Sequence, residues 1–333
     1  MEKGYTYSDV LIKPNYSEIK TRTSVDLTTH LGNHEFKFPV ISANMKNITG
    51  PKMAKEISDH GGLGLLHRFN SIEQALDDFD ECGSSEGVGV SIGVQDEDKE
   101  RFSRLYEYGA RIFCIDVAHG HHILMKNMLL WINSTLSEEE RRKVTIIAGN
   151  IATPEAYEDF IYWGADVAKV GIGPSPVCRT RYNTGVGMPQ LYALEKICEK
   201  ADHSPLPIDI IADGGISHVG DISKALAFSD AVMLGSMISG TSETPVSVFR
   251  NDEGQFYTVY GGSASAENKG ENRFVEGIIK TTPFKGHVKY IFREIEQGLQ
   301  SAFSYVGATN LGEFQENCEF IMLSGGSRSE SVV

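Results

Sequence analysis

Eight short runs of apolar and β-branched residues recur along the chain. Each run is nearly continuous in apolar residues instead of alternating, which is typical of parallel strands that are covered on both faces. Segments with helical periodicity separate most of the runs, so a strand–helix unit repeats at intervals of roughly 23 to 33 residues, with one longer gap before the seventh run. The runs are residues 39–45, 61–68, 88–94, 111–117, 144–151, 167–173, 208–216 and 231–237.

The number of runs distinguishes between two α/β architectures. Eight strand–helix units predict a closed (β/α)8 TIM barrel, and an open doubly wound sheet is the alternative. We favour the barrel because no Gly-x-Gly-x-x-Gly motif follows the first run. No linker or change of composition separates a second unit, so we expect residues 1–333 to form a single catalytic domain.

The chain beyond the eighth run contains a long polar stretch and one more helix. Apolar residues at helical spacing over 286–307 predict the last helix of the outer ring. Residues 251–286 are polar and rich in glycine. Because long irregular stretches inside compact domains are usually functional, we expect a lid or binding loop between the eighth strand and the last helix.

Composition excludes several classes of protein. The 333 residues include 31 Lys and Arg against 45 Asp and Glu, a formal charge of −14, and the absence of a basic cluster argues against a nucleic-acid partner. No run reaches about 18 apolar residues and the first residues lack a signal-peptide core, so we expect a cytoplasmic protein with no membrane partner. Five widely spaced cysteines without a CxxC pair indicate neither a disulfide framework nor a structural zinc site.

The richest candidate for chemistry is residues 171–190, where Cys178 is followed by Arg179, Thr180 and Arg181. The active site of a TIM barrel lies at the carboxyl ends of the strands, where this segment begins. Neighbouring cations favour the thiolate form of a cysteine, which is the nucleophile. We predict that Cys178 is catalytic; the alternative is a buried structural cysteine, which is how we interpret the other four. Further polar residues after the runs are Asn44, His67, Arg68, Asp116, His119, Asn150, Asp213, Gly235 and Ser236.

Two glycine-rich turns suggest an anion site. Residues 212–216 end the seventh run and residues 233–237 end the eighth. Turns after these two strands bind phosphate in many TIM barrels, because exposed backbone N–H groups and a helix N-terminus converge there. Ordinary tight turns are the alternative. Since the Asp213 carboxylate suits a ribose diol, the pattern predicts a phosphorylated, nucleotide-like substrate attacked by a thiolate, and the residues alone do not identify the base or the redox partner.

The chain carries a set of specific motifs, in order SANM, IDVAHGH, AGN, KVGIGPSPVCRTRYNTGVGMPQ, IADGGI, MLGSM, YGGSAS, VEG and PFKG. Together they resemble the IMP dehydrogenase/GMP reductase family over nearly the whole chain. Three features are similar to the reductase branch of that family. Residues 65–74 lead directly into a helix, which leaves no room for an inserted regulatory domain; Asn44 stands where the dehydrogenases carry proline; and residues 272–277 read NRFVEG.

The resemblance implies an activity and a mechanism. It implies an oxidoreductase of purine nucleotide interconversion that uses NADPH to convert GMP to IMP and ammonia. The Cys178 thiolate would attack C2 of the guanine, ammonia would leave, and hydride from the nicotinamide would reduce the resulting thioimidate. Thr180 and Glu276 would form the relay that protonates the departing ammonia.

The resemblance also implies binding residues and an assembly. The nucleotide would be held by Asp213, Gly214, Gly215, Gly235, Ser236, Gly261, Gly262, Ser263, Arg273 and Gly277. The cofactor NADPH would contact Asp116, Val117, Ala118, Arg68, Ile172 and Gly173. A monovalent cation, K⁺, would bind carbonyl oxygens of Gly173, Ser175, Cys178 and Arg181. The assembly implied is a homotetramer.

One departure from the family pattern and two alternative functions remain. Ser175 replaces a glycine of the family, and a positive φ at this position would strain the cation loop. The first alternative is an IMP dehydrogenase that lacks the regulatory insert. The second is a non-catalytic or lyase-type phosphate-binding barrel in which Cys178 is structural.

Overall fold

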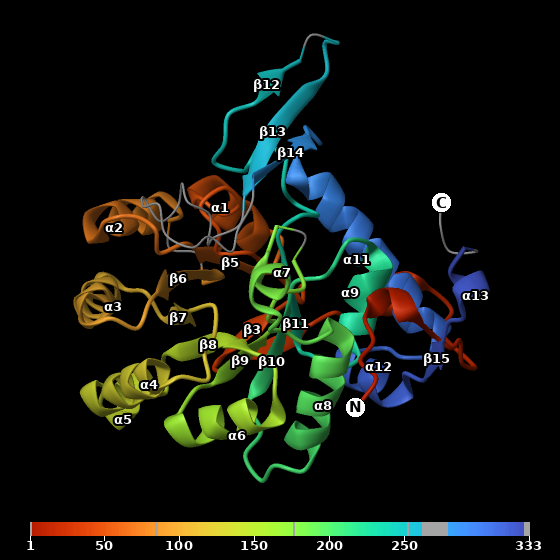
Figure 1. Cartoon of the computed structure of the whole chain (residues 1–333), viewed down its shortest axis with the longest axis horizontal. Coiled ribbons are helices and arrows are strands. Elements are labelled where there is room, and N and C mark those ends of the chain that lie inside the picture. The colour runs from red at the N-terminus through yellow and green to blue at the C-terminus, as the bar shows by residue number, and fades with distance from the viewer. Residues whose placement is uncertain (1, 84–85, 176, 252, 262–278, 330–333) are drawn as a thin grey trace.

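Eight parallel strands close into a barrel at the centre of the molecule (Figure 1). The computed structural model describes residues 2–83, 86–175, 177–251, 253–261 and 279–329. Neighbours along the chain pair in sequence, and the last strand pairs with the first through Met233 and Ile41, which closes the ring. The strands are β4 Val40–Ser42, β5 Leu63–Leu66, β6 Val88–Ile92, β7 Ile112–Asp116, β8 Thr145–Ile151, β9 Val167–Val170, β10 Asp209–Asp213 and β11 Ala231–Leu234.

All eight strands fall inside the runs predicted from the sequence, so the barrel prediction is confirmed. Every residue of β6 and β9 is buried. Side chains on one face fill the barrel and those on the other meet the outer helices, which explains why the runs are apolar without alternation.

Helices form an outer ring around the barrel (Figure 1). Their ends follow the local sequence: the Thr153 side chain accepts a hydrogen bond from the N–H of Ala156, Pro154 occupies the first turn, and Gly164 ends that helix with a φ of 82°. The helices are α1 Pro51–Asp59, α2 Ile72–Glu81, α3 Asp96–Tyr108, α4 Ile123–Thr135, α5 Glu138–Arg141, α6 Pro154–Trp163, α7 Thr180–Thr184, α8 Gln190–Asp202, α9 Val219–Leu226, α11 Val288–Tyr305, α12 Leu311–Asn317 and α13 Gly325–Ser329. Helix α11 is the predicted last helix of the ring.

Small antiparallel sheets complete the chain. Strands β2 (Thr29–Leu31) and β3 (His34–Phe36) form a hairpin, and β1 (Val10–Ile12) pairs with β15 (Phe320–Met322), which ties the two ends of the chain together. Short 3₁₀ turns at Tyr7–Asp9 and Arg22–Ser24 flank β1.

A three-stranded arm projects from one end of the barrel (Figure 1). It consists of β12 (Phe249–Arg250), β13 (Phe256–Gly261) and β14 (Ile279–Pro283). The expectation of an irregular stretch over 251–286 is therefore wrong for its two ends, which pair from Tyr257↔Pro283 to Gly261↔Ile279. This pairing joins segments far apart in sequence, so the local pattern does not reveal it.

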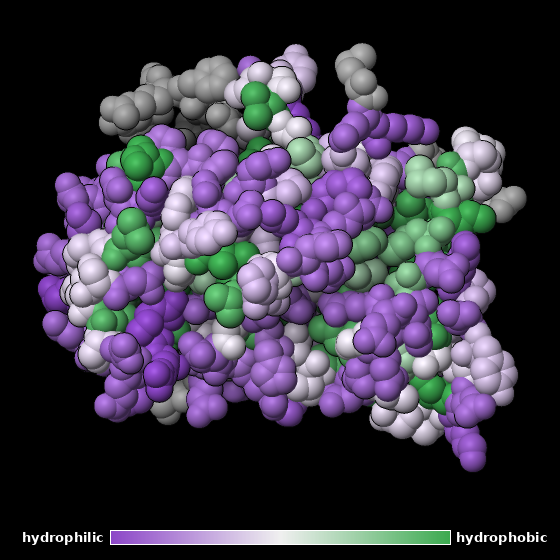
Figure 2. Space-filling model, turned by 90° about the horizontal axis from the view of Figure 1, so that it is seen from below, coloured by the Kyte–Doolittle hydropathy of each residue, from purple (hydrophilic) through white to green (hydrophobic). Residues whose placement is uncertain are grey.

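The surface seen in Figure 2 is mostly hydrophilic, with hydrophobic side chains in small separate groups. Within the described residues, no helix combines the length and the apolar character needed to cross a membrane.

Candidate active site

A cavity of about 240 Å³ opens at the carboxyl ends of the barrel strands. Its wall contains Cys178 and Thr180, two of the three predicted catalytic residues. All six predicted cofactor residues line it, namely Arg68, Asp116, Val117, Ala118, Ile172 and Gly173. It also contains Asp213, Gly214, Gly215, Gly235 and Ser236 from the predicted nucleotide site. Loops after most of the strands thus meet at one cavity, as the barrel topology requires.

The cavity wall places a thiol beside a hydroxyl. The Cys178 Sγ lies 3.1 Å from the Thr180 Oγ1, which is hydrogen-bonding distance for sulfur. The Cys178 N–H donates to the Ser175 carbonyl at 3.0 Å, and Thr180 is the first residue of α7. The loop is therefore fixed on both sides of the sulfur, and a thiol and a hydroxyl share one edge of the cavity.

The other four cysteines are chemically different from Cys178. All are free thiols, and burial raises the pKa of Cys82, Cys114, Cys198 and Cys318 to about 12 in each case. A thiol with a raised pKa carries little thiolate at neutral pH and is a poor nucleophile. Among the described residues that line the cavity, Cys178 is the only cysteine, which supports its selection from the sequence.

A buried lysine forms the floor of the cavity. The Lys169 Nζ lies 2.9 Å from Oδ1 of Asp116 and 3.1 Å from Oδ2 of Asp213, and it also contacts the Asn150 side-chain oxygen. Burial alone would raise the pKa of Asp116, but the Lys169 ammonium outweighs it and holds that pKa below its ordinary value. Burial opposes the charge on Lys169 too, yet the two carboxylates raise its pKa.

Lys169 is not among the site residues predicted from the sequence, because it lies inside an apolar run that predicts a strand of the core. A signal was present: a single charged residue in an otherwise apolar parallel strand must be paired when buried. Asn150, which the sequence did single out, completes the group by donating to the Gly171 carbonyl and to Oδ2 of Asp213, both at 2.7 Å.

The opposite wall is made of glycine turns. Gly214 and Gly215 have φ values of 94° and 79°, a backbone conformation that favours glycine. A Cβ on Gly214 would lie 2.9 Å from Cγ of Pro174, so the turn packs closely on the cysteine loop. On the far side a Cβ on Gly235 would lie 2.9 Å from the hydroxyl of Tyr260, a cavity residue that the sequence analysis also missed.

The chain matches the family model described as the IMP dehydrogenase / GMP reductase domain over residues 4–333. The chain belongs to the IMP dehydrogenase/GMP reductase family. It is 37% identical over 330 residues to the GMP reductase of Bacillus subtilis, covering 97% of each chain. It is 39% identical over 312 residues to the GMP reductase of Streptococcus agalactiae, covering 92% of this chain and 91% of that one.

A solved structure of the same family is also similar. It is a GMP reductase from Trypanosoma brucei in complex with guanosine 5′-monophosphate, with a TM-score of 0.90 and 27% sequence identity over 100% of this chain and 98% of that one. The resemblance inferred from the motifs is thereby confirmed at the level of family and fold.

The loop that was predicted to bind a cation contains an arginine side chain. The Arg181 side chain packs against Gly173 and Gly187, where a Cβ on either would lie 2.6 Å from Cγ of Arg181. Its guanidinium donates to the carbonyls of Ile172, at 3.4 Å, and Met188. No non-glycine residue in the described ranges has a positive φ, so the backbone strain expected at Ser175 is not present.

Two of the four carbonyls predicted to bind a cation already accept backbone hydrogen bonds. The Ser175 carbonyl accepts from Cys178 at 3.0 Å, and the Arg181 carbonyl accepts from Gly185 at 3.0 Å. Each of these carbonyls keeps a second lone pair, but the Arg181 guanidinium beside Gly173 puts a fixed positive charge in the loop, which disfavours a second cation there.

Several predicted residues of the family site lie outside the described residues: Gly262, Ser263, Arg273, Glu276 and Gly277. Gly261 is described and ends β13, directly after the cavity residue Tyr260. The roles of these five residues and of Gly261 stay predictions.

Proposed function

We propose that the protein is a GMP reductase that converts GMP to IMP and ammonia with NADPH. The observation that carries this proposal is the Cys178–Thr180 pair, 3.1 Å apart, on the wall of a cavity that also contains Asp213 and the Gly214–Gly215 turn. The named reductases in the family, which align with nearly the whole chain, support the choice of branch.

The glycine turns and Asp213 would hold the nucleotide. Backbone N–H groups of Gly214, Gly215, Gly235 and Ser236 would bind the phosphate, while Asp213 accepts hydrogen bonds from the ribose hydroxyls. The purine C2 would then face Cys178 across the cavity. Holding C2 and the sulfur close together in a fixed orientation raises their effective concentration, which is a large part of the rate enhancement of such a site.

Cys178 would act as the nucleophile. Its thiolate adds to C2 of the guanine, the bond from C2 to the amino nitrogen breaks, and ammonia leaves after the nitrogen gains a proton. The Thr180 hydroxyl, 3.1 Å from the sulfur, is placed to pass this proton, with Glu276 proposed as the next member of the relay. Hydride addition at C2 is followed by cleavage of the C2–sulfur bond, which releases IMP and regenerates the thiolate.

The residues opposite the nucleotide turns fit a nicotinamide ring. Val117, Ala118 and Ile172 supply apolar surface, and Asp116 supplies an acceptor for a carboxamide. The Arg68 guanidinium, which donates from Nε to the Asp116 carbonyl at 3.1 Å and stacks over Phe69 at 4.9 Å, adds a cation for the dinucleotide phosphates. When bound, NADPH supplies the hydride. A single barrel without a regulatory insert, assembled as a homotetramer, completes the proposal.

The test is a two-direction assay. A GMP reductase consumes NADPH with GMP and releases IMP and ammonia in equal amounts. NADH formation from IMP and NAD⁺, with no NADPH consumption on GMP, would identify an IMP dehydrogenase instead. Absence of both activities, with GMP still binding, would favour a phosphate-binding barrel. Repeating the assay in buffers with and without K⁺ tests the cation, which we expect to be dispensable because Arg181 occupies the loop.

A further inference from the structure

Lys169 owes its position to the register of three neighbouring strands. It is paired with Gly149 on β8, and Gly149 is paired with Asp116 on β7. Gly149 has no side chain, and a Cβ there would lie 2.6 Å from Cβ of Lys169. The lysine stem therefore passes over β8 to reach the Asp116 carboxylate, which an ordinary residue at Gly149 would prevent.

On its other side Lys169 reaches the strand that carries the nucleotide turn. It is paired with Ile211 on β10, and Asp213 lies two residues further along the same strand. Two residues along a strand return to the same face, so Asp213 points to the interior where Lys169 lies. One ammonium thus touches a carboxylate of the proposed cofactor wall and a carboxylate of the proposed nucleotide wall.

Exposure divides the three charged side chains by role. The Lys169 side chain is 2% exposed, whereas the side chains of Asp116 and Asp213 are 17% and 23% exposed, and both line the cavity. The lysine side chain therefore has almost no surface that a ligand could contact, whereas both carboxylates have exposed surface in the cavity. In the described part of the chain Oδ1 of Asp213 accepts no hydrogen bond, because the bonds from Lys169 and Asn150 both go to Oδ2.

We propose that Lys169 is a positioning residue for both ligands: its ammonium is the shared counter-ion that keeps Asp116 and Asp213 ionised and fixes one oxygen of each, leaving Asp213 ready to accept the ribose hydroxyls. This inference rests on the proposed function for the identity of the two ligands. The inference goes beyond the proposed function, because it makes the binding of both nucleotide and cofactor depend on one buried group that touches neither reacting atom.

The electrostatic reason is direct. Two carboxylates that share a buried site and lose their common cation cannot both stay ionised, and they retain a proton to higher pH. Without Lys169 one carboxylate of the pair would therefore bind a proton more readily, and the affinity for ligands that need both carboxylates ionised would fall as the pH is lowered. Among the described residues, the charged and titratable groups that face this cluster are Asp116 and Cys114 on β7, Asp213 on β10, Arg68 after β5, Tyr7 before β1 and Tyr260 on β13.

The experiment compares three variants with the wild-type chain. Lys169→Met removes the charge and keeps the length of the stem, and Lys169→Arg keeps the charge with different geometry. Arg141→Met is the matched control, because Arg141 forms a comparable ion pair with Asp166 at 2.9 Å at the opposite end of the barrel. Dissociation constants for GMP and for NADPH are measured separately between pH 6.5 and 9, and each is divided by the wild-type value at the same pH.

We expect Lys169→Met to lower kcat/KM by on the order of 100-fold and to weaken the binding of both ligands. The ratio of each dissociation constant to the wild-type value should vary with pH by about 10-fold, and the largest loss of affinity should occur at pH 6.5. Lys169→Arg should give a ratio that does not change with pH, and both dissociation constants should rise together, by about 3-fold or more. Arg141→Met should leave both constants at wild-type values.

Three outcomes would overturn the proposal. In the first, Lys169→Met lowers only the unfolding midpoint, as the control does, and both dissociation constants stay within about two-fold of wild type. In the second, the ratio of its dissociation constants to those of the wild-type chain does not change with pH. If Lys169→Met does not fold, Lys169→Arg decides, and weakening of only one ligand, or of neither, contradicts a shared counter-ion.

These results are separable from the proposed function. A wild-type chain that binds GMP and NADPH without reducing GMP would overturn the reductase activity, while the binding ratios would still test Lys169. Conversely, a fully active reductase whose Lys169→Met variant binds both ligands normally would overturn only the role of Lys169.

Discussion

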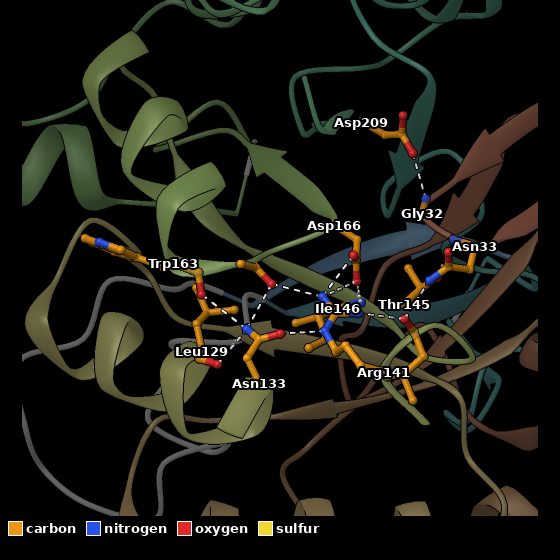
Figure 3. A network of polar contacts seen from close by, with 12 residues as sticks. Gly32, Asn33, Leu129, Asn133, Arg141, Thr145, Ile146, Trp163, Asp166 and Asp209 are labelled. Atoms are coloured by element: carbon orange, nitrogen blue, oxygen red, sulfur yellow. Dashed lines mark hydrogen bonds and ion pairs between the residues drawn. The ribbon is translucent and has the colours of Figure 1, made fainter. Parts of the chain in front are cut away.

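The two ends of the barrel both hold partly buried cation–carboxylate groups, and they use them differently. At the carboxyl end Lys169 contacts Asp116, Asp213 and Asn150, all through side chains. At the amino end Arg141 contacts Asp166 at 2.9 Å and donates as well to the backbone carbonyls of Val144 and Gly164, both at 3.0 Å (Figure 3).

The carboxylates at the amino end bond mainly to backbone N–H groups. Asp166 accepts from Ile146 at 2.7 Å, and Asp209 accepts from Gly32 in the turn of the β2–β3 hairpin at 2.6 Å (Figure 3). A side chain that hydrogen-bonds to backbone groups holds the backbone in place, and those hydrogen-bonding atoms are then not directed toward a ligand. A side chain that bonds to other side chains fixes their orientation instead. Similar ion pairs therefore stabilise the fold at the amino end of the barrel and preorganise a site at the carboxyl end.

The largest expected effect is at the carboxyl end. Cys178→Ala should lower GMP-dependent NADPH oxidation by at least about 1000-fold, because Cys178 carries the one thiol among the described residues of the cavity wall and is the proposed nucleophile. Cys198→Ala, on the face of α8, is the matched control and should retain wild-type turnover. Steady-state rates and the unfolding midpoints of both variants are measured together. Turnover by Cys178→Ala within about ten-fold of wild type would contradict the division between the ends.

The next effect is at the amino end. Arg141→Met should lower the free energy of unfolding by about 3 kcal/mol, because it leaves the partly buried Asp166 carboxylate without its cation and removes one of the donors to each of the Val144 and Gly164 carbonyls. We expect kcat and KM to change by less than about two-fold, since the cavity lies at the other end of the barrel. Urea unfolding and steady-state kinetics on the same preparation separate the two quantities. A large loss of kcat/KM with unchanged stability would show that Arg141 serves the active site and does not stabilise the fold.

A pH-dependent effect sharpens the description of the amino end. Burial, with a smaller contribution from Asp209, raises the pKa of Asp230 to about 7, and its carboxylate accepts from the N–H of Ile210 at 2.7 Å. The raised pKa lies above the unfolded value, so this group lowers stability as pH rises from about 4 to 7 and has no further effect above.

Asp230→Asn removes this titration and keeps an acceptor for Ile210. The variant should therefore gain stability relative to wild type, by about 2 kcal/mol, when the pH is raised from 5 to 8. Chemical unfolding at the two pH values measures the difference. A stability difference between the two chains that is the same at both pH values would show that Asp230 is ionised throughout.

The smallest expected effect returns to the carboxyl end. Gly214→Ala places a Cβ where φ is 94° and where Cγ of Pro174 would be 2.9 Å away, so the phosphate turn must shift. We expect KM for GMP to rise about 10-fold while KM for NADPH stays unchanged, because only the nucleotide turn moves. Gly220→Ala, which has open space around its Cβ position, is the control. An equal rise in both KM values would show that the two walls are not independent at Gly214.

The sequence was sufficient for the barrel and for much of its active end. Each barrel strand is a short apolar run, and the parallel topology brings the ends of such runs together, so Cys178, Asp116 and Asp213 could be placed at one edge without coordinates. The motifs then added the chemistry. All of these inferences depend on local sequence or on an arrangement that the fold class guarantees.

What the sequence did not reveal depends on pairing. Lys169 is recognisable as a functional group only when its register opposite Gly149 and Asp116 is known. The strands β13 and β14 are separated by a long polar segment, and nothing in either indicates that Tyr257 lies opposite Pro283. In the cation loop, the contact of Arg181 with Gly173 and Gly187 is a tertiary contact that the spacing of these residues does not predict.

The central claim, that chemistry at the carboxyl end occurs on the Cys178 sulfur, is tested most directly by alkylation. Iodoacetamide at neutral pH should modify Cys178 first, since burial raises the pKa of the other four thiols. The fraction of Cys178 alkylated, measured by peptide mass spectrometry, is compared with residual NADPH oxidation on GMP. We predict that activity falls in proportion to modification and that GMP slows both; full alkylation of Cys178 with activity retained would contradict the account.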